Sequence, residues 1–484
     1  MRLKIIQKVL GLLLALFSLT ILPSLIVSIV LADGAHNAFL IAITVTLVGG
    51  ALMWLPVKNF SGELRLRDGF IIVVLFWLVL GLCGSIPFLA VQNPQMTVID
   101  SIFESISGLT TTGATVLKDI DEVVPSLLFY RQFLQWLGGM GIIVLAVAVL
   151  PMLGVGGMQL YRAETPGPMK ESKLTPRIKE TAKMLWYIYL SLTICCAVAY
   201  YLAGMSFFDA VAHSFSTVAI GGFSTHNMSI GYFDNAMIEL IAIIFMFVAG
   251  VNFTLHFISW RQKSITHYLK DSEFVTYTSI LILAFLVCSI GLFSLSTADA
   301  DISTIIRKSL FQTISMGTTA GFSTDQFQQW PLFFPLILIF LSFVGGCAGS
   351  TGGGIKVVRC LLLYKQGIRE IQRLIHPNAV LKIRMGNRAV SSRVIEAVWG
   401  FFAAYVVVFI LLMLALMVTG LDPITSFSAV AACLNNLGPG LGSVAEHYGD
   451  ISAWAKSLLC LAMLLGRLEI FTLLVILTPS FWRA

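Results

Sequence analysis

The sequence predicts an all-α polytopic membrane protein, and two observations carry the prediction. Hydrophobic residues fill 57% of the 484 positions while charged residues fill only 12%, and the mean hydropathy of +0.89 lies far above that of soluble globular chains. Apolar runs of about 20 residues, the length that crosses a hydrocarbon core, recur along the chain. We therefore expect most of the protein to be solvated by lipid.

Ten apolar runs are expected to span the membrane, separated by charged or Gly/Pro-rich breaks. The first follows a basic N-terminus and extends from Val9 to about Ala32, which is longer than the 7–15 residues, roughly, of a signal-peptide core. We expect it to be retained as the first helix. The ten runs lie at 9–31, 37–57, 69–91, 127–152, 182–204, 235–259, 275–296, 332–362, 395–420 and 453–480.

Basic residues predict the orientation of these spans. With a cytoplasmic N-terminus, 25 of the 31 Lys and Arg residues fall on the inner side, and 15 of them lie in the segments 162–183 and 356–393. The positive-inside rule therefore predicts that both termini are cytoplasmic. Most of the basic charge is explained by topology and contact with anionic lipid. A share of it is expected to dock a soluble regulator, and no basic block indicates nucleic acid.

Cysteine spacing gives no indication of a metal site. The eight cysteines fall mostly within apolar runs, without the C-x-x-C spacing or histidine clusters that tetrahedral coordination requires. We interpret them as small hydrophobic residues of the protein interior.

Four segments between the spans, all on the predicted outer side, share a pattern that ends on a glycine. Six residues before this glycine stand Ser107, Ser216, Ser315 and Ala432; eight before it stand Ser105, Ser214, Thr313 and Val430; two after it stand Thr115, Ser224, Ser323 and Gly440. An internal repeat of this kind is stronger evidence about the fold than any single motif. Each unit is interpreted as a span, a half-helix of about ten residues, a loop and a second span. The four segments are FESISGLTTTG ending at Gly113, AHSFSTVAIGG ending at Gly222, FQTISMGTTAG ending at Gly321 and SAVAACLNNLG ending at Gly438.

The pattern predicts a cation pore. Non-helical backbone at membrane depth is tolerated when it lines water or is buried in protein, so the four loops should meet around one axis. Glycine permits positive φ, which lets successive carbonyls point inward and replace the hydration shell of an ion. The C-terminal ends of the half-helices would face the pore centre with their negative dipole ends. The candidate filter residues are Thr111, Thr112, Gly113, Ile220, Gly221, Gly222, Thr318, Thr319, Gly321, Asn435, Asn436 and Gly438, with Ala320 and Leu437 in the same strands. An ordinary re-entrant packing loop is the alternative.

These motifs resemble the Trk-type potassium uptake channel subunits of bacteria (TrkH/TrkG), in the superfamily that includes the Ktr and plant HKT transporters. The resemblance covers nearly the whole chain. It is carried by GLTTTGAT from Gly108, AIGGFSTH from Ala219, TTAGFSTD from Thr318, GGCAGSTGGGIK from Gly345, NNLGPGLG from Asn435, GRLE from Gly466, FYRQFLQWLGGMGI from Phe129 and GGMQLYRAETPGP from Gly156.

The resemblance implies a two-span N-terminal unit followed by four pore repeats around one pseudo-four-fold pore. The corresponding boundaries are 1–60, 61–160, 161–262, 263–375 and 376–484. It further implies a homodimer with one pore per subunit in the inner membrane, and a cytosolic, TrkA-like regulator of conductance that binds a nucleotide such as ATP, ADP or NAD. K⁺ would be the transported ion, with no covalently bound cofactor.

The fourth repeat departs from a symmetric potassium filter, because it has Asn435, Asn436 and Pro439 where the others have Thr, Ile, Ala, Ser or Phe. Fewer equivalent carbonyl rings should weaken discrimination, so K⁺ and Rb⁺ are expected to be preferred over Na⁺ by a modest margin.

A glycine-rich run is expected to interrupt the eighth span. Each glycine within a helix lowers the stability of the helix by about 1 kcal/mol relative to alanine, so this run should not form a continuous helix. We expect a flexible loop here that occludes the pore until a partner moves it; a tight helix crossing is the alternative. A phosphate loop is rejected because Ile355 separates the last glycine from Lys356. The candidate gate glycines are Gly345, Gly346, Gly349, Gly352, Gly353 and Gly354.

Arg467 is a single charge within the last span, where such residues usually face a cavity or a partner. It is expected to border the pore below the filter and to add an electrostatic barrier to cations. A structural ion pair, with Glu469 or another carboxylate, is the alternative.

Two other classes of function remain open. A symporter coupling K⁺ to H⁺ or Na⁺ would need a carboxylate for the coupling ion, and Glu104, Asp209 and Asp422 lie near the half-helix starts, where they could attract cations or cap helices. An enzyme is the weakest interpretation, because no catalytic constellation is evident and the histidines are scattered, with His213 and His226 flanking one filter loop.

Overall fold

The computed structural model describes residues 3–60, 66–141, 178–295, 301–331, 333–379, 381–386, 388–468 and 470–482. The described chain is almost entirely helical. Its only strands are β1 (Arg384–Met385) and β2 (Arg388–Ala389), an antiparallel pair in which Arg384 lies opposite Ala389.

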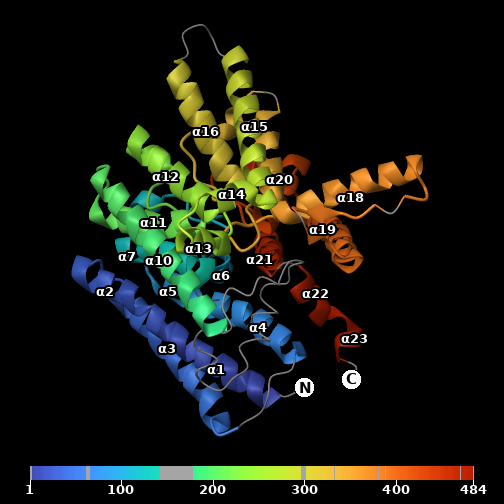
Figure 1. The fold of residues 1–484 in the computed structure, drawn as a ribbon. Coiled ribbons are helices and arrows are strands. Elements are labelled where there is room, and N and C mark those ends of the chain that lie inside the picture. The colour runs from blue at the N-terminus through green and yellow to red at the C-terminus, as the bar shows by residue number, and fades with distance from the viewer. Residues whose placement is uncertain are drawn as a thin grey trace.

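The N-terminal unit is a helical hairpin. α1 (Leu3–Thr20) and α3 (His36–Trp54) run side by side along the lower left of Figure 1, and α2 (Leu22–Leu31), with Pro23 in its first turn, continues the direction of α1 after a break at Ile21. A short 3-10 turn, η1 (Leu55–Val57), closes the unit.

α1 and α3 cross at two small residues. A methyl group built at Gly50 would lie 2.7 Å from the amide nitrogen of Ala15 and from the carbonyl oxygen of Gly11, and one at Gly11 would lie 2.8 Å from the carbonyl oxygen of Gly50. The two backbones therefore touch directly, as small residues allow in membrane helices.

Four successive groups of helices follow, and each contains a shorter helix that leads into one of the recurring glycines. These four half-helices are α6 (Val98–Leu109), α11 (Phe207–Ala219), α16 (Ile302–Thr318) and α20 (Pro423–Leu434). The remaining helices are α4 (Leu66–Gly84), α5 (Ile86–Ala90), α7 (Pro125–Trp136), α10 (Ile178–Leu202), α12 (Ala236–Ala249), α13 (Phe253–Arg261), α14 (Thr266–Lys270), α15 (Ser272–Leu295), α17 (Phe334–Val344), α18 (Val357–Ile375), α19 (Ser392–Val418), α21 (Ala453–Arg467), α22 (Phe471–Leu477) and α23 (Pro479–Trp482). Single turns are η2 (Ile120–Glu122), the π-turn η3 (Leu137–Gly141), η5 (Ser229–Phe233), η6 (Phe327–Gln329) and η7 (Gly442–Val444).

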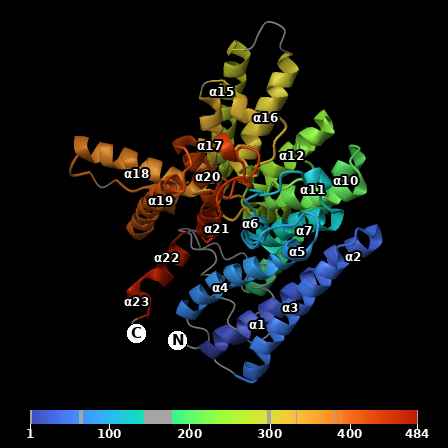
Figure 2. The same cartoon turned by 180° about the vertical axis from the view of Figure 1, so that it is seen from behind.

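The C-terminal parts of the half-helices are buried inside the protein, and the long apolar helices lie outside them. α15 and α16 project together at the top of Figures 1 and 2, and α18 extends sideways away from the main body. The long helices expose large apolar side chains along their length, such as Leu283 on α15 and Leu411 on α19. Such a surface is suited to lipid.

Six described helices are long and apolar enough to cross a membrane by themselves, where the sequence predicts ten spans. The expected span 235–259 is two helices, α12 and α13, bent by 92°, and the expected span 453–480 is α21 and α22, bent by 112°. The expected spans 127–152 and 332–362 also differ: the first is described only to residue 141, and the second consists of α17, a loop and α18.

The contact between α1 and α3 gives a first testable prediction. Gly50→Ala should lower the stability of the purified protein by about 1–3 kcal/mol, because the new methyl group overpacks a backbone contact. Gly49→Ala is the matched control, since its methyl group would meet only a Leu14 side-chain carbon at 3.6 Å. Thermal melting in detergent measures both variants, and equal melting temperatures would contradict the crossing.

Candidate functional site

All four half-helices end with the same hydrogen-bonded turn. The N–H of the residue before each recurring glycine donates to the carbonyl five residues earlier, over 2.7 to 2.9 Å, and the N–H of the preceding residue donates to the carbonyl three residues earlier. This pair of bonds is the Schellman motif that terminates many helices. The first set of bonds joins Thr112 to Ser107, Gly221 to Ser216, Ala320 to Ser315 and Leu437 to Ala432.

The backbone of each loop then alternates in handedness. The residue two before the glycine has positive φ in every repeat, at 55° in Thr111, 54° in Ile220, 71° in Thr319 and 54° in Asn436. The glycine is also positive, with φ between 78° and 101°. Positive φ in a β-branched residue is a genuine outlier that costs on the order of 1–3 kcal/mol. Its recurrence in three of the four loops indicates that the surrounding packing imposes the conformation.

The four glycines close a ring of backbone contacts. A methyl group built at Gly113 would lie less than 3.0 Å from the carbonyl oxygen of Gly221, and the same relation links each repeat to the next. Gly222 faces the carbonyl of Ala320, Gly321 faces that of Leu437, and Gly438 faces that of Thr112. Two constraints therefore require glycine at each of these positions: the positive φ, and the close approach of the carbonyl group from the neighbouring loop.

A polar pair supports three of the loops from behind. The residue nine before the glycine bonds to the hydroxyl two after it: Glu104 accepts from Thr115 at 3.0 Å, His213 pairs with Ser224 at 2.9 Å, and Gln312 donates to Ser323 at 3.0 Å. In the fourth repeat, the Ser428 hydroxyl donates to the Leu441 carbonyl and accepts from its N–H. Only the hydroxyl half of this pattern is among the features predicted from the sequence. The polar residues at a fixed offset before the glycine were the signal for the other half.

The first repeat also contains a fully buried ion pair. Arg131 Nε lies 2.6 Å from Glu104 Oε1 and both side chains are 0% exposed. The guanidinium donates in addition to the Ser224 carbonyl at 3.2 Å and lies over the ring of Phe223 at 4.2 Å. The pair therefore ties the half-helix of repeat 1 to the loop of repeat 2.

Glu104 thus differs from the expectation of a carboxylate at a half-helix start, because it lies within α6 and is fully paired. Asp422 is the N-cap of α20 and accepts from the N–H groups of Ile424 and Thr425, which is the capping alternative. Asp209 accepts from Thr225 at 2.7 Å, and its Oδ1 lies 3.5 Å from Nε2 of His226. No carboxylate of the three is left unpaired.

His226 joins two repeats at the side where the half-helices begin. Its Nδ1 lies 2.8 Å from Asp121, which follows the loop of repeat 1. Partial burial lowers the pKa of His226, but the hydrogen bonds with Asp209 and Asp121 outweigh burial, so the pKa lies above its usual value. Across the described residues, no group of three or more His, Cys, Asp or Glu side chains could hold a metal ion.

The glycine-rich run forms a loop from Gly345 to Lys356 that packs against the loops of repeats 3 and 4 and against the end of half-helix α11. The Gly353 N–H donates to the Thr319 hydroxyl at 2.6 Å, the Gly354 N–H donates to the Asn435 carbonyl at 3.0 Å, and Thr351 donates to the Val218 carbonyl at 2.9 Å. The alternative of a helix crossing is wrong here, because the segment is not helical.

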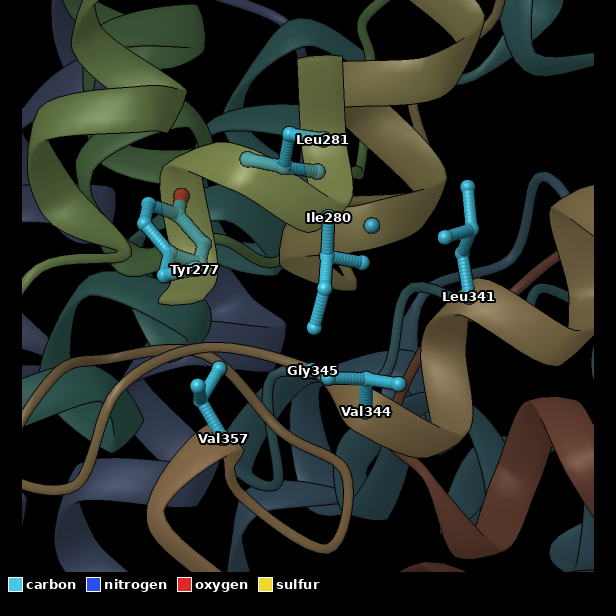
Figure 3. Close-up of a pocket in the computed structure, with 8 residues that line it drawn as sticks. Tyr277, Ile280, Leu281, Leu341, Val344, Gly345 and Val357 are labelled. Atoms are coloured by element: carbon cyan, nitrogen blue, oxygen red, sulfur yellow. The ribbon is translucent and has the colours of Figure 1, made fainter. Parts of the chain in front are cut away.

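Figure 3 shows where this loop leaves α17. Leu341 and Val344 face Ile280 and Leu281 of α15 across a small apolar pocket, with Gly345 at its lower edge. Val357, the first residue of α18, lines the same pocket, so the two ends of the loop lie close together.

Arg467 contacts both the loop of repeat 1 and the glycine-rich loop. Its guanidinium donates to the Thr111 hydroxyl at 3.1 Å, to the Thr351 carbonyl at 3.5 Å and to the Gly139 carbonyl at 2.7 Å. Glu469, the partner considered from the sequence, lies outside the described residues, as does most of the segment 162–183.

The bend between α12 and α13 has its cause in the glycine-rich loop. The Gly250 carbonyl accepts from the Cys347 N–H at 2.9 Å, and the Phe253 N–H donates to the Gly349 carbonyl at 3.0 Å. Asn252 caps α13 through the Thr254 N–H. Backbone groups that a continuous helix would pair internally are thus paired with a loop about 100 residues away in sequence. Sequence periodicity carries no such information.

Comparisons with known proteins identify relatives of this chain. Residues 35–483 match the family model of TrkH, described as cation transport protein. The chain is 57% identical to the Trk system potassium uptake protein TrkH of Vibrio parahaemolyticus and 53% identical to that of Escherichia coli, over 100% of each chain. It is 41% identical to TrkG of Escherichia coli over 99% of each chain. The crystal structure of the potassium transporter TrkH from Vibrio parahaemolyticus matches with a TM-score of 0.91 and 54% identity over 100% of both chains. The predictions of an all-α polytopic membrane fold and of Trk-type membership are confirmed.

The buried ion pair gives a second testable prediction. Arg131→Met or Glu104→Gln alone should each destabilise the protein by about 3–5 kcal/mol, because each leaves an uncompensated buried partner. The double variant should recover most of the loss, and thermal melting in detergent measures it. A double variant as unstable as the sum of the single ones would contradict the pairing.

Proposed function

Because the chain belongs to the TrkH family of cation transport proteins, we propose that it takes up K⁺ across the bacterial inner membrane and that the ring of four loops is its selectivity filter. The observation that carries the proposal is the closed ring of backbone contacts at Gly113, Gly222, Gly321 and Gly438. The curated relatives are named potassium uptake proteins of transport systems and have no enzymatic name.

The filter residues are those predicted from the sequence. Alternating backbone handedness around each glycine supports carbonyls turned toward the axis, and a carbonyl ring binds a cation without a fixed charge that would trap it. The loops are unequal in their side chains, which supports a modest preference of K⁺ and Rb⁺ over Na⁺. The half-helices end at the ring, so their negative dipole ends add to the attraction.

The gate consists of the glycine-rich loop and Arg467, below the filter. The loop bonds to Thr319 and Asn435, and Arg467 bonds to Thr111, so a loop displacement would change contacts at three of the four filter strands. Two glycines of this loop approach the filter strands closely, because a methyl group at Gly352 would lie 2.8 Å from the Thr318 carbonyl oxygen and one at Gly353 less than 3.0 Å from the Asn435 carbonyl oxygen.

The assembly proposed for this subunit is a homodimer with a cytosolic, nucleotide-binding regulator, both termini being cytoplasmic. The sideways projection of α18 supports a partner there, because the helix exposes Tyr364, Ile371 and Leu374 outside the main body. The relatives are named as parts of a Trk system, which supports further components. Basic residues of 356–393 supply charge for docking.

Coupled symport with H⁺ or Na⁺ is the second candidate. The carboxylates it would need at the filter loops are engaged: Glu104 with Arg131, Asp209 with Thr225, and Asp422 with the start of α20. This observation favours passive conduction.

Radioactive rubidium uptake into sealed liposomes tests the function. Uptake should follow the K⁺ electrochemical gradient and ignore imposed Na⁺ or H⁺ gradients; a requirement for either gradient would establish symport.

Gly222→Ala should abolish uptake, because its methyl group would enter the space of the Ala320 carbonyl. Gly204→Ala is the matched control, with φ of 107° and nothing within 4 Å. Full uptake by Gly222→Ala would overturn the filter.

Rubidium uptake by Arg467 variants in the same liposomes tests the gate. Arg467→Ala should raise basal rubidium uptake about tenfold or more, since a unit charge 4 Å from an ion costs about 4 kcal/mol at an effective dielectric of 20. Arg467→Lys retains the charge and should stay near the basal rate. Unchanged flux in Arg467→Ala would assign the residue a structural role.

A further inference from the structure

The second filter loop lacks a side chain at a position where the other three have one. The residue before the recurring glycine is Thr112, Ala320 or Leu437 in repeats 1, 3 and 4, and it is Gly221 in repeat 2. Two consecutive glycines leave this stretch of backbone the least restricted of the four.

The amide of Gln135 occupies the space of the missing side chain. A methyl group built at Gly221 would lie less than 3.0 Å from Cδ, Oε1 and Nε2 of Gln135. Gln135 comes from α7, in the preceding repeat, and is 0% exposed. Gly221 and Gln135 are therefore complementary in volume.

Both ends of this amide are hydrogen-bonded to the loop. Nε2 donates to the Gly221 carbonyl at 2.6 Å, and Oε1 accepts from the Phe223 N–H at 3.1 Å. The two bonds lie on either side of Gly222, so a single side chain brackets the recurring glycine. An orientation that satisfies both bonds is also the only one that fits, since flipping the amide would place donor against donor.

Gln135 acts with neighbours on the same face of α7. Gln132 donates to the Phe223 carbonyl at 3.2 Å, and Arg131 donates to the Ser224 carbonyl at 3.2 Å. Residues three or four apart on a helix share a face, so Arg131 and Gln132 lie on the same face as Gln135 and meet one continuous stretch of loop. This accounts for the polar residues of the FYRQFLQW motif, which the proposed function leaves unused.

We propose that Gln135 is a positioning residue for ion selectivity, which fixes the Gly221 peptide and thereby the carbonyl geometry of the second filter strand. The inference rests on the proposed function of the loops as a filter. Without the amide, the Gly221–Gly222 peptides gain alternative orientations at little cost. Discrimination between ions of different radius then falls, while the pathway itself stays open.

Four variants test the proposal in the full-length protein, with rubidium and sodium fluxes measured in liposomes. Gln135→Ala should lower the rubidium-to-sodium flux ratio at least fivefold, because fivefold is about the effect of one lost hydrogen bond and this variant loses two. Gln135→Glu retains the acceptor for Phe223 but loses the donor to Gly221, and should lower the ratio similarly. Gly221→Ala should block transport by overlap with Gln135, and Gly221→Ala with Gln135→Ala should restore it. Gln7→Ala is the control. It removes a hydrogen bond from the Gln7 side-chain amide to the Met53 carbonyl in the N-terminal unit and should leave the ratio unchanged.

The outcomes separate this inference from the function on which it rests. An unchanged flux ratio in Gln135→Ala and Gln135→Glu, with Gly222→Ala inactive, overturns the role of Gln135 and leaves the filter standing. Transport by Gly222→Ala at the normal ratio overturns the filter itself. Failure of the double variant to transport, when size-exclusion chromatography shows it folded, overturns the volume complementarity.

Discussion

Backbone contact between consecutive repeats is the constraint on which the rest of the structure depends. At four places a glycine Cα meets the carbonyl of the next loop so closely that no other residue fits, and the last repeat contacts the first. Loops this close cannot be separated by side chains, so their conformation has to be imposed from outside the ring. The Schellman turns fix where each loop leaves its half-helix, and the polar pairs behind three loops fix where it ends.

That requirement explains an interior that is unusually polar for a protein in lipid. Arg131 and Glu104 are fully buried, as are Gln132 and Gln135, because backbone carbonyls and N–H groups at the loops need partners that lipid cannot supply. The glycine-rich loop obeys the same rule. It pairs with backbone groups left open where α12 ends, so the bend in one span and the break in another stabilise each other.

The sequence predicts best those structural features that depend on the conformation of a few neighbouring residues. The recurring glycines, the small residues six positions before them and the interruption at Gly345 could all be predicted, since φ and close approach select for glycine at fixed positions. The bends at Gly250 and Leu468 could not, because an apolar run looks the same whether its helix continues or its carbonyls pair with a distant loop. The partners of Glu104 and Gln135 were also hidden, because only the folded chain brings Arg131 of α7 to Glu104 and the Gly221 carbonyl to Gln135.

Since all four strands of the ring are encoded in one polypeptide, each quarter can diverge independently. In a homotetramer, a substitution such as leucine for alanine before the recurring glycine would appear four times, and its steric effect would be multiplied. Here Thr112, Gly221, Ala320 and Leu437 occupy equivalent places, and the space beside Gly221 is filled by the Gln135 amide. A single mutation therefore alters one side of the ring, which lets evolution change the geometry of the ring in finer steps than a symmetric assembly allows.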